Sequence, residues 1–146
     1  MMYLLDTNVV SELRKVRLGK ADKQVSAWVG KIDASNLFVS VITLMELEMG
    51  VLAIERRDAQ QGKLLRQWLD ERVVPEFEER TISIDTTIAQ RCARLHIRDR
   101  QGERDALIAA TALVHGMTVA TRNINDFLPS QVACVNPWLP PKRTRT

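Results

Sequence analysis

The chain has 146 residues, of which 45% are hydrophobic and 27% are charged, and it carries a net charge of +3. This length and composition predict one globular domain. No apolar run approaches the ~18–20 residues of a membrane-spanning helix, and the N-terminus lacks the basic segment and long apolar core of a signal peptide. We therefore expect a cytoplasmic protein with no membrane partner, whose two cysteines are reduced.

The positive charge is unevenly placed along the chain. Five arginines lie between positions 91 and 104, and no acid follows Asp126, whereas three basic residues lie near the C-terminus. Basic patches suit a polyanionic partner such as nucleic acid. The alternative, that these arginines only solvate helix faces, remains open on charge alone.

A short apolar run ends abruptly at Asp6, and a helical pattern follows it. This order predicts a buried strand that places a carboxylate at its C-terminal end, where open α/β sheets bind ligands. Two later apolar strands lead in the same way into Glu46 and Asp126. The three strands are predicted over residues 2–5, 37–42 and 117–121.

Strands and helices alternate along the rest of the chain without a long loop. The pattern predicts helices over residues 9–15, 22–32, 44–57 and 59–74 (ended by Pro75), a strand over 80–84, a helix between Asp85 and Gly102, a largely apolar helix from Asp105 to a stop at Gly116, and an edge strand over 132–135. We expect an α/β protein with three layers, α/β/α, around a parallel sheet of four to five strands. Residues 1–140 would form one domain, and residues 141–146 a basic C-terminal tail.

Each of four acids also has a purely structural interpretation. Asp6 and Asp105 could cap the helices that follow them. Glu46 could belong to a capping box with Thr43, and Asp126 could brace an Asx-turn.

The four acids are harder to explain structurally as a group. The carboxyl ends of parallel strands share one edge of the sheet, and carboxylates brought together there repel unless a cation lies between them. Mg²⁺ and Mn²⁺ prefer oxygen ligands, and such an ion can activate water and neutralise a phosphoryl group. The acids therefore predict a divalent metal site that acts on a phosphate ester.

Five motifs occur together in a specific order and spacing. They are Leu4-Leu5-Asp6-Thr7-Asn8 followed by Ser11-Glu12, Glu46-Leu47 followed by Gly50, Asp105-Ala106-Leu107-Ile108-Ala109-Ala110-Thr111-Ala112, Thr121-Arg122-Asn123 with Asp126-Phe127, and Asn136-Pro137-Trp138. In this order they resemble the PIN-domain ribonucleases of the VapC toxin type, close to the FitB-like branch. The resemblance covers almost the whole chain.

The resemblance implies Mg²⁺- or Mn²⁺-dependent cleavage of RNA by a PIN-like domain. By motif position, Asp6, Glu46, Asp105 and Asp126 would be the catalytic and metal-binding acids. Asp6 and Asp105 would be the firmest ligands, while Glu46 and Asp126 would act through water. The supporting polar groups would be Thr7, Asn8, Thr121 and Asn123, and the RNA-binding arginines would be Arg98, Arg100, Arg104 and Arg122.

Two departures from the family pattern bear on this expectation. Asn123 stands where some PIN domains carry another aspartate, so the second metal position is expected to be weak or absent. Residues 101–104, which precede Asp105, are more charged than the small apolar residues usual at this place in the family. The resemblance also implies a homodimer that is silenced by an antitoxin encoded beside it. Trp28 and Trp68, with the apolar residues around them, exceed what a small core needs, which favours self-association.

Three other functions share some of these features. A phosphatase of the haloacid dehalogenase type also opens with a strand and an aspartate, but its acid two residues later is Asn8 here. A receiver domain has an acidic pocket but gives no reason for Asp126. A silent PIN module that only binds RNA or a protein remains an alternative, although all four acids are present.

Overall fold

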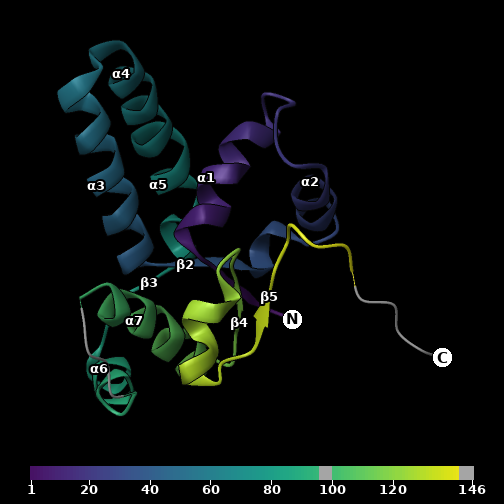
Figure 1. Ribbon diagram of the computed structural model, residues 1–146, viewed down its shortest axis with the longest axis vertical. Helices are drawn as coiled ribbons and strands as arrows, with labels where there is room; N and C mark the ends of the chain where they lie inside the picture. The colour runs from purple at the N-terminus through teal and green to yellow at the C-terminus, as the bar shows by residue number, and fades with distance from the viewer. Residues whose placement is uncertain (96–99, 142–146) are drawn as a thin grey trace.

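A computed structural model describes residues 1–95 and 100–141, with only the backbone described at Arg100 and Gln101 (Figure 1). The described strands form one parallel sheet in the order β3-β2-β1-β4-β5. They are β1 (Tyr3–Leu5), β2 (Leu37–Ser40), β3 (Thr81–Ile82), β4 (Thr118–Ala120) and β5 (Cys134–Val135). Leu4 of β1 lies opposite Phe38 on one side and Val119 on the other, which makes β1 the centre of the sheet.

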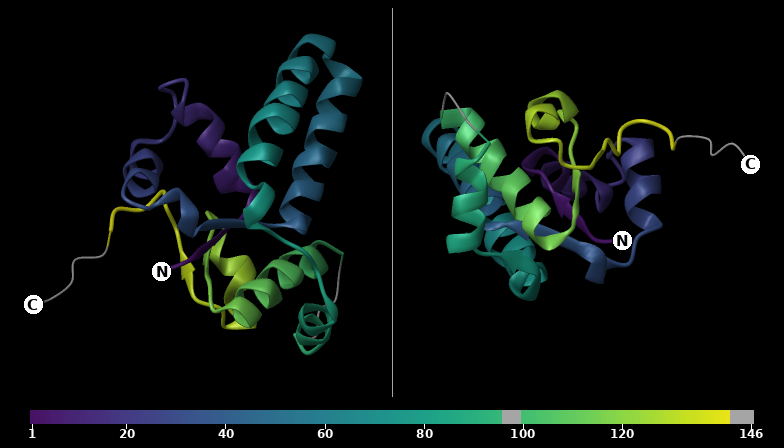
Figure 2. Two further views of the ribbon diagram at one scale, coloured as in Figure 1. Left: turned by 180° about the vertical axis from the view of Figure 1, so that it is seen from behind. Right: turned by 90° about the horizontal axis from the view of Figure 1, so that it is seen from below.

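Helices cover both faces of this sheet, as Figures 1 and 2 show. The α-helices are α1 (Thr7–Val16), α2 (Lys23–Gly30), α3 (Val41–Arg57), α4 (Ala59–Trp68), α5 (Val74–Glu76), α6 (Thr86–Ala93) and α7 (Arg100–His115). Shorter helical turns are η1 (Ala34–Asn36), η2 (Leu69–Val73), η3 (Glu78–Arg80) and η4 (Ile124–Ser130). Helices α1 to α5 lie on one side of the sheet, and α6, α7 and η4 lie on the other. The predicted three-layer α/β/α fold is confirmed.

The sheet separates two apolar cores. Leu5 and Val39 face the layer of α1 and α3, whereas Leu4 and Val119 face α7. Strands buried on both faces read as nearly continuous apolar runs, which is why the sequence predicts them well. The two tryptophans suspected of excess apolar surface, Trp28 and Trp68, pack against the first core, so they give no support for self-association.

Helices α3 and α4 form a hairpin that projects from the sheet (Figure 1). They pack closely at Gly62, where a Cβ atom would lie 2.6 Å from the Cα of Glu55. The second helix of the hairpin does not end at Pro75 as predicted. It continues through the π turn η2, in which Val74 N–H donates to the carbonyl of Leu69, and this wider turn accommodates the proline.

Two helices begin three or more residues earlier than the sequence predicts. Helix α3 starts at Val41 because Ser40 caps it, with its hydroxyl accepting from Ile42 N–H. Helix α7 starts at Arg100 and runs through Gly102, which was predicted to be a stop. The surrounding Gln, Glu and Arg residues form helices readily enough to offset one glycine, which costs about 1 kcal/mol. Helix α7 ends as predicted at Gly116, which has φ +66°.

Among the described residues, no helix is both long and apolar enough to cross a membrane.

Candidate active site

Asp6 lies at the end of the central strand, where the chain order along the sheet reverses between β1 and β4. Its Oδ1 atom accepts from Thr7 N–H at 2.8 Å, so Asp6 is the N-cap of α1. Its Oδ2 atom accepts from Thr121 Oγ1 at 2.8 Å and from Asn8 Nδ2 at 3.3 Å. The capping role and the position at the ligand-binding edge of the sheet therefore both apply to the same carboxylate.

The surroundings of Asp6 contain groups that raise the pKa of its carboxyl and groups that lower it. Burial raises the pKa of this carboxyl, and the negative charge of Glu46 adds to the effect. Hydrogen bonds from Thr121, Thr7 and Asn8 oppose the rise in pKa because they favour the charged form. The side chain is only 6% exposed, so its orientation is set by these three donors.

Glu46 is not part of a capping box. Helix α3 is capped by Ser40, and the Thr43 hydroxyl instead reaches the Leu5 carbonyl at 3.4 Å. The Glu46 carboxylate accepts from Thr7 Oγ1 at 2.8 Å and from Arg104 Nε at 3.2 Å. Glu46 therefore joins α3 to α1 and α7 at the same edge of the sheet as Asp6.

Asp105 lies inside α7 and not at its N-terminus, so the capping interpretation is wrong for this residue. The pKa of its carboxyl is raised to about 7, first by burial and then by the negative charges of Asp6, Asp126 and Glu46, while Arg104 opposes the rise. Asp6, Asp126 and Glu46 therefore all lie near enough to act on the charge of Asp105, although the four acids come from four separate segments of the chain.

Asp105 and Asp126 have few partners compared with Asp6 and Glu46. Asp126 is exposed in the first turn of η4. In residues 1–95 and 100–141, neither carboxylate makes a hydrogen bond or an ion pair. The predicted Asx-turn at Asp126 is therefore not seen there. Asp6 and Glu46 are therefore fixed in position by their hydrogen bonds, whereas no described group fixes the carboxylate of Asp105 or Asp126.

The donor set fits a hard divalent cation. All four side chains offer carboxylate oxygens, and their mutual repulsion favours a positive ion. Across the described part of the chain, no three acidic, histidine or cysteine side chains are grouped closely enough to enclose an ion. A magnesium ion usually keeps several waters and contacts only one or two carboxylates, which the four acids at this edge could supply.

The predicted supporting residues surround the acids. Thr7 and Thr121 donate to Glu46 and Asp6, and Asn8 contacts both Asp6 and the Arg122 N–H, at 3.2 Å. The Asn123 N–H donates to Thr121 Oγ1 at 3.0 Å, which holds the threonine in place.

The four predicted RNA-binding arginines differ in their surroundings. Arg104 is tied to Glu46, and the exposed Arg122 lies over the Trp138 ring at 5.0 Å. Arg98 and the side chain of Arg100 lie outside the described residues. Sequence reasoning missed the ion pair of Arg104, because its partner is 58 positions away in the chain.

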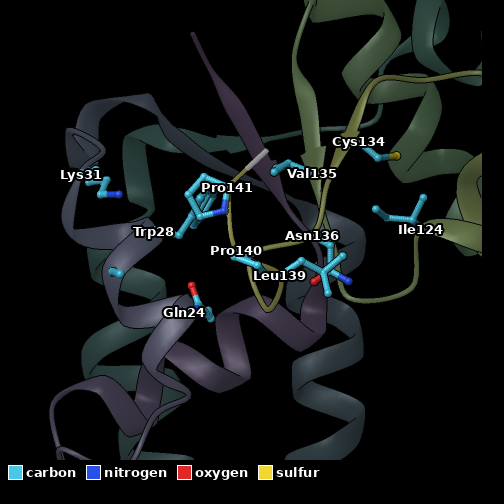
Figure 3. Close-up of a pocket in the computed structure, with 11 residues that line it drawn as sticks. Gln24, Trp28, Lys31, Ile124, Cys134, Val135, Asn136, Leu139, Pro140 and Pro141 are labelled. Atoms are coloured by element: carbon cyan, nitrogen blue, oxygen red, sulfur yellow. The ribbon is translucent and has the colours of Figure 1, made fainter. Parts of the chain in front are cut away.

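A cavity of about 490 Å³ lies between α2 and the segment after β5 (Figure 3). Trp28, Val135, Leu139 and Pro140 contribute to its mostly apolar lining. It adjoins the site through Asn136, whose Nδ2 donates to the Arg122 carbonyl at 3.4 Å. None of the four acids lines this cavity, so it is not the place where the acids meet.

Comparison with known proteins places this arrangement in a family. The family model described as "PIN domain" matches residues 3–128. The chain belongs to the PIN-domain family. Its relatives include toxin FitB of Neisseria gonorrhoeae, which is 32% identical over 94% of this chain and 99% of its own length. VapC ribonuclease Y4jK of Sinorhizobium fredii is 33% identical over 95% of this chain and 99% of its own length.

Two solved structures superpose on nearly the whole length of the chain. A structure of FitAB bound to an IR36 DNA fragment matches with a TM-score of 0.84 at 29% identity, covering 98% of this chain and 100% of that chain. FitAcB from Neisseria gonorrhoeae matches with a TM-score of 0.81 at 32% identity, covering 94% of this chain and 99% of that chain. The resemblance suggested by the five sequence motifs is confirmed.

Proposed function

We propose that this chain is a divalent-metal-dependent endoribonuclease that acts as the toxin of a toxin–antitoxin pair. The observation that carries the proposal is the group of four carboxylates at the carboxyl edge of the sheet, two of them without partners in the described part of the chain. The names of relatives point the same way, since one is called a toxin and another a VapC ribonuclease.

Asp6 and Asp105 would hold the metal ion directly, while Glu46 and Asp126 would act through water. A bound Mg²⁺ or Mn²⁺ ion would supply an activated water and would neutralise charge on the phosphoryl group that is attacked. Thr121 and Thr7 orient Asp6 and Glu46 for these roles.

Asp105 is the residue that should respond most to a cation. Its pKa of about 7 leaves the carboxyl partly protonated near neutral pH. A positive charge nearby favours the ionised form, so Asp105 would lose its proton when an ion enters the site. The carboxylate would then be fully available to position the ion and the attacked phosphate.

RNA, an antitoxin and a second copy of the chain are the proposed partners. Arg122 is exposed and follows Thr121 directly, so it is a candidate contact for a phosphate beside the site. Helix α3 exposes Met45, Met49 and Leu52 by 42%, 48% and 42%, at helical spacing along one face. Such an apolar face supports association, and light scattering of the purified chain would test whether it dimerises.

An RNA-cleavage assay with Mg²⁺, Mn²⁺ or EDTA tests the proposal. We expect cleavage to need the metal, and Asp105→Asn to lower the rate by about 10²–10³-fold or more, as loss of a group that stabilises the transition state does. Glu48→Gln is the matched control, because it removes a carboxylate of α3 that lies in a different cluster.

Two outcomes would contradict the proposal. Asp105→Asn could cut RNA at the wild-type rate, or the wild-type activity could be the same in EDTA. A wild-type chain that binds RNA but never cleaves it, with either metal, would favour the silent PIN module instead.

A further inference from the structure

One arginine lies among the acids of the site. Arg104 precedes Asp105 in α7, and its Nε atom donates to Oε2 of Glu46 at 3.2 Å. The two side chains are 28% and 16% exposed, so this ion pair is largely shielded from water. A positive group of the chain itself thus lies beside the carboxylates of the site.

The ion pair sets Glu46 apart from the three aspartates, because its partner carries a positive charge. Asp6 accepts instead from the neutral donors of Thr7, Thr121 and Asn8. Both oxygens of Glu46 are occupied, one by Arg104 and the other by Thr7 Oγ1 at 2.8 Å. Asp105 and Asp126, by contrast, have no hydrogen-bond or ion-pair partner within the residues that the structure describes. A cation that enters the site would therefore meet Glu46 already neutralised and the aspartates unneutralised.

We propose that Arg104 is a positioning residue that holds Glu46 out of direct contact with the metal ion, so that the ion is held by aspartates. This inference rests on the proposed function, because it concerns the metal of that site. A guanidinium–carboxylate hydrogen bond is charge-assisted and among the stronger ones in proteins. Bringing the ion onto Glu46 would break this bond and leave the Arg104 charge facing a divalent cation.

Removal of the arginine should therefore change metal affinity in a direction that is easy to recognise. Without Arg104, Glu46 becomes an additional free carboxylate and the site becomes more negative by one charge. Both changes favour a cation. A residue that merely braced α7 against α3 would have the opposite effect, since its loss would loosen the site and weaken metal binding.

Calorimetric titration of MnCl₂ into the chelator-treated full chain at neutral pH tests the inference without any activity measurement. We expect Arg104→Gln to lower the Kd for Mn²⁺ by roughly three- to tenfold, as removal of one partly exposed charge should. Arg104→Lys, which keeps the charge, should stay nearer to wild type. Arg66→Gln removes the same charge from a distant cluster and should leave the Kd unchanged.

The double variant Arg104→Gln with Glu46→Gln removes both charges together. If the ion is held by aspartates, its Kd should lie within about threefold of wild type. This variant leaves no unpaired glutamate, so it keeps the test decisive even if the single variant does not fold.

Either of two results would overturn the inference while leaving the proposed function intact. Wild type could bind Mn²⁺ and Arg104→Gln could bind it equally or more weakly, or the double variant could lose affinity more than tenfold, which would make Glu46 a direct ligand. If wild type itself takes up no Mn²⁺, the proposed function fails and this inference fails with it.

Discussion

Helix α3 contributes carboxylates to two clusters that are neutralised in different ways. Glu48 and Glu55 face Arg66 of α4, whose Nη1 donates to Glu48 at 2.7 Å and whose Nη2 donates to Glu55 at 2.9 Å. Arg66 lowers the pKa of the Glu48 carboxyl. Two residues before Glu48, Glu46 joins the site where the pKa of Asp105 is raised to about 7.

The difference shows how a structural cluster of acids can be told from a functional one. In the hairpin of α3 and α4, the chain supplies a cation for the carboxylates it brings together. In the site, Arg104 pairs with Glu46, and the repulsion among the other acids persists. Carboxylates whose pKa values are raised by burial and by one another are typical of sites that act on a ligand.

The larger expected effect concerns the pH dependence of stability in EDTA. The pKa of the Asp105 carboxyl is 3.8 ordinarily and about 7 in the folded protein. Ionising this carboxyl therefore costs no stability below pH 3.8, and it costs most above about pH 7. Stability of the metal-free wild type should therefore fall as pH rises between these values. Asp105→Asn lacks this cost and should gain about 1 kcal/mol relative to wild type between pH 5 and pH 7.5, after allowance for solvent screening.

Thermal melts of both proteins at the two pH values measure this gain. The stability difference between variant and wild type at pH 5 is subtracted from that at pH 7.5, so the contributions of the other titrating groups cancel. Glu48→Gln is the matched control, because a lowered carboxyl pKa changes stability only below its ordinary value of 4.5. Its melting temperature relative to wild type should not change between pH 5 and pH 7.5. If the stability of Asp105→Asn relative to wild type fell as pH rises, this result would contradict the charge repulsion assigned to Asp105.

The smaller effect concerns the hairpin. Arg66→Gln leaves Glu48 and Glu55 without their shared cation and should lower the melting temperature, by no more than about 3 °C because the cluster is partly exposed. Added Mg²⁺ should stabilise this variant as much as wild type. If Mg²⁺ instead compensated specifically for the loss of Arg66, the hairpin cluster would also be a cation site and the comparison would fail.

Much of this site follows from the sequence because its residues come directly after strands. Buried parallel strands are recognisable as apolar runs in the sequence. Asp6 directly follows β1 and Thr121 directly follows β4. Their meeting at one edge of the sheet follows from the topology alone. The same strand pattern points to Glu46 and Asp126, and the family motifs support grouping them with Asp105, although the local surroundings of all three also permit structural interpretations.

Part of what the sequence does not predict depends on contacts between distant segments. The start of α7 is missed because Gly102 looks like a stop, whereas the helix-forming residues around it carry the helix through. The capping box at Thr43 is a valid local pattern, but Ser40 caps α3 and Thr43 is used to contact Leu5. The pairing of Arg104 with Glu46 has no local pattern at all.

The most direct test of the central claim is the effect of Mg²⁺ on thermal stability. At a hundredfold excess over its Kd, Mg²⁺ should stabilise wild type by about 2.7 kcal/mol relative to EDTA. Arg66→Gln should gain the same amount, and Asp105→Asn should gain much less. A wild-type melting temperature that Mg²⁺ leaves unchanged, or an equal gain for Asp105→Asn, would contradict the assignment of these carboxylates as a metal site.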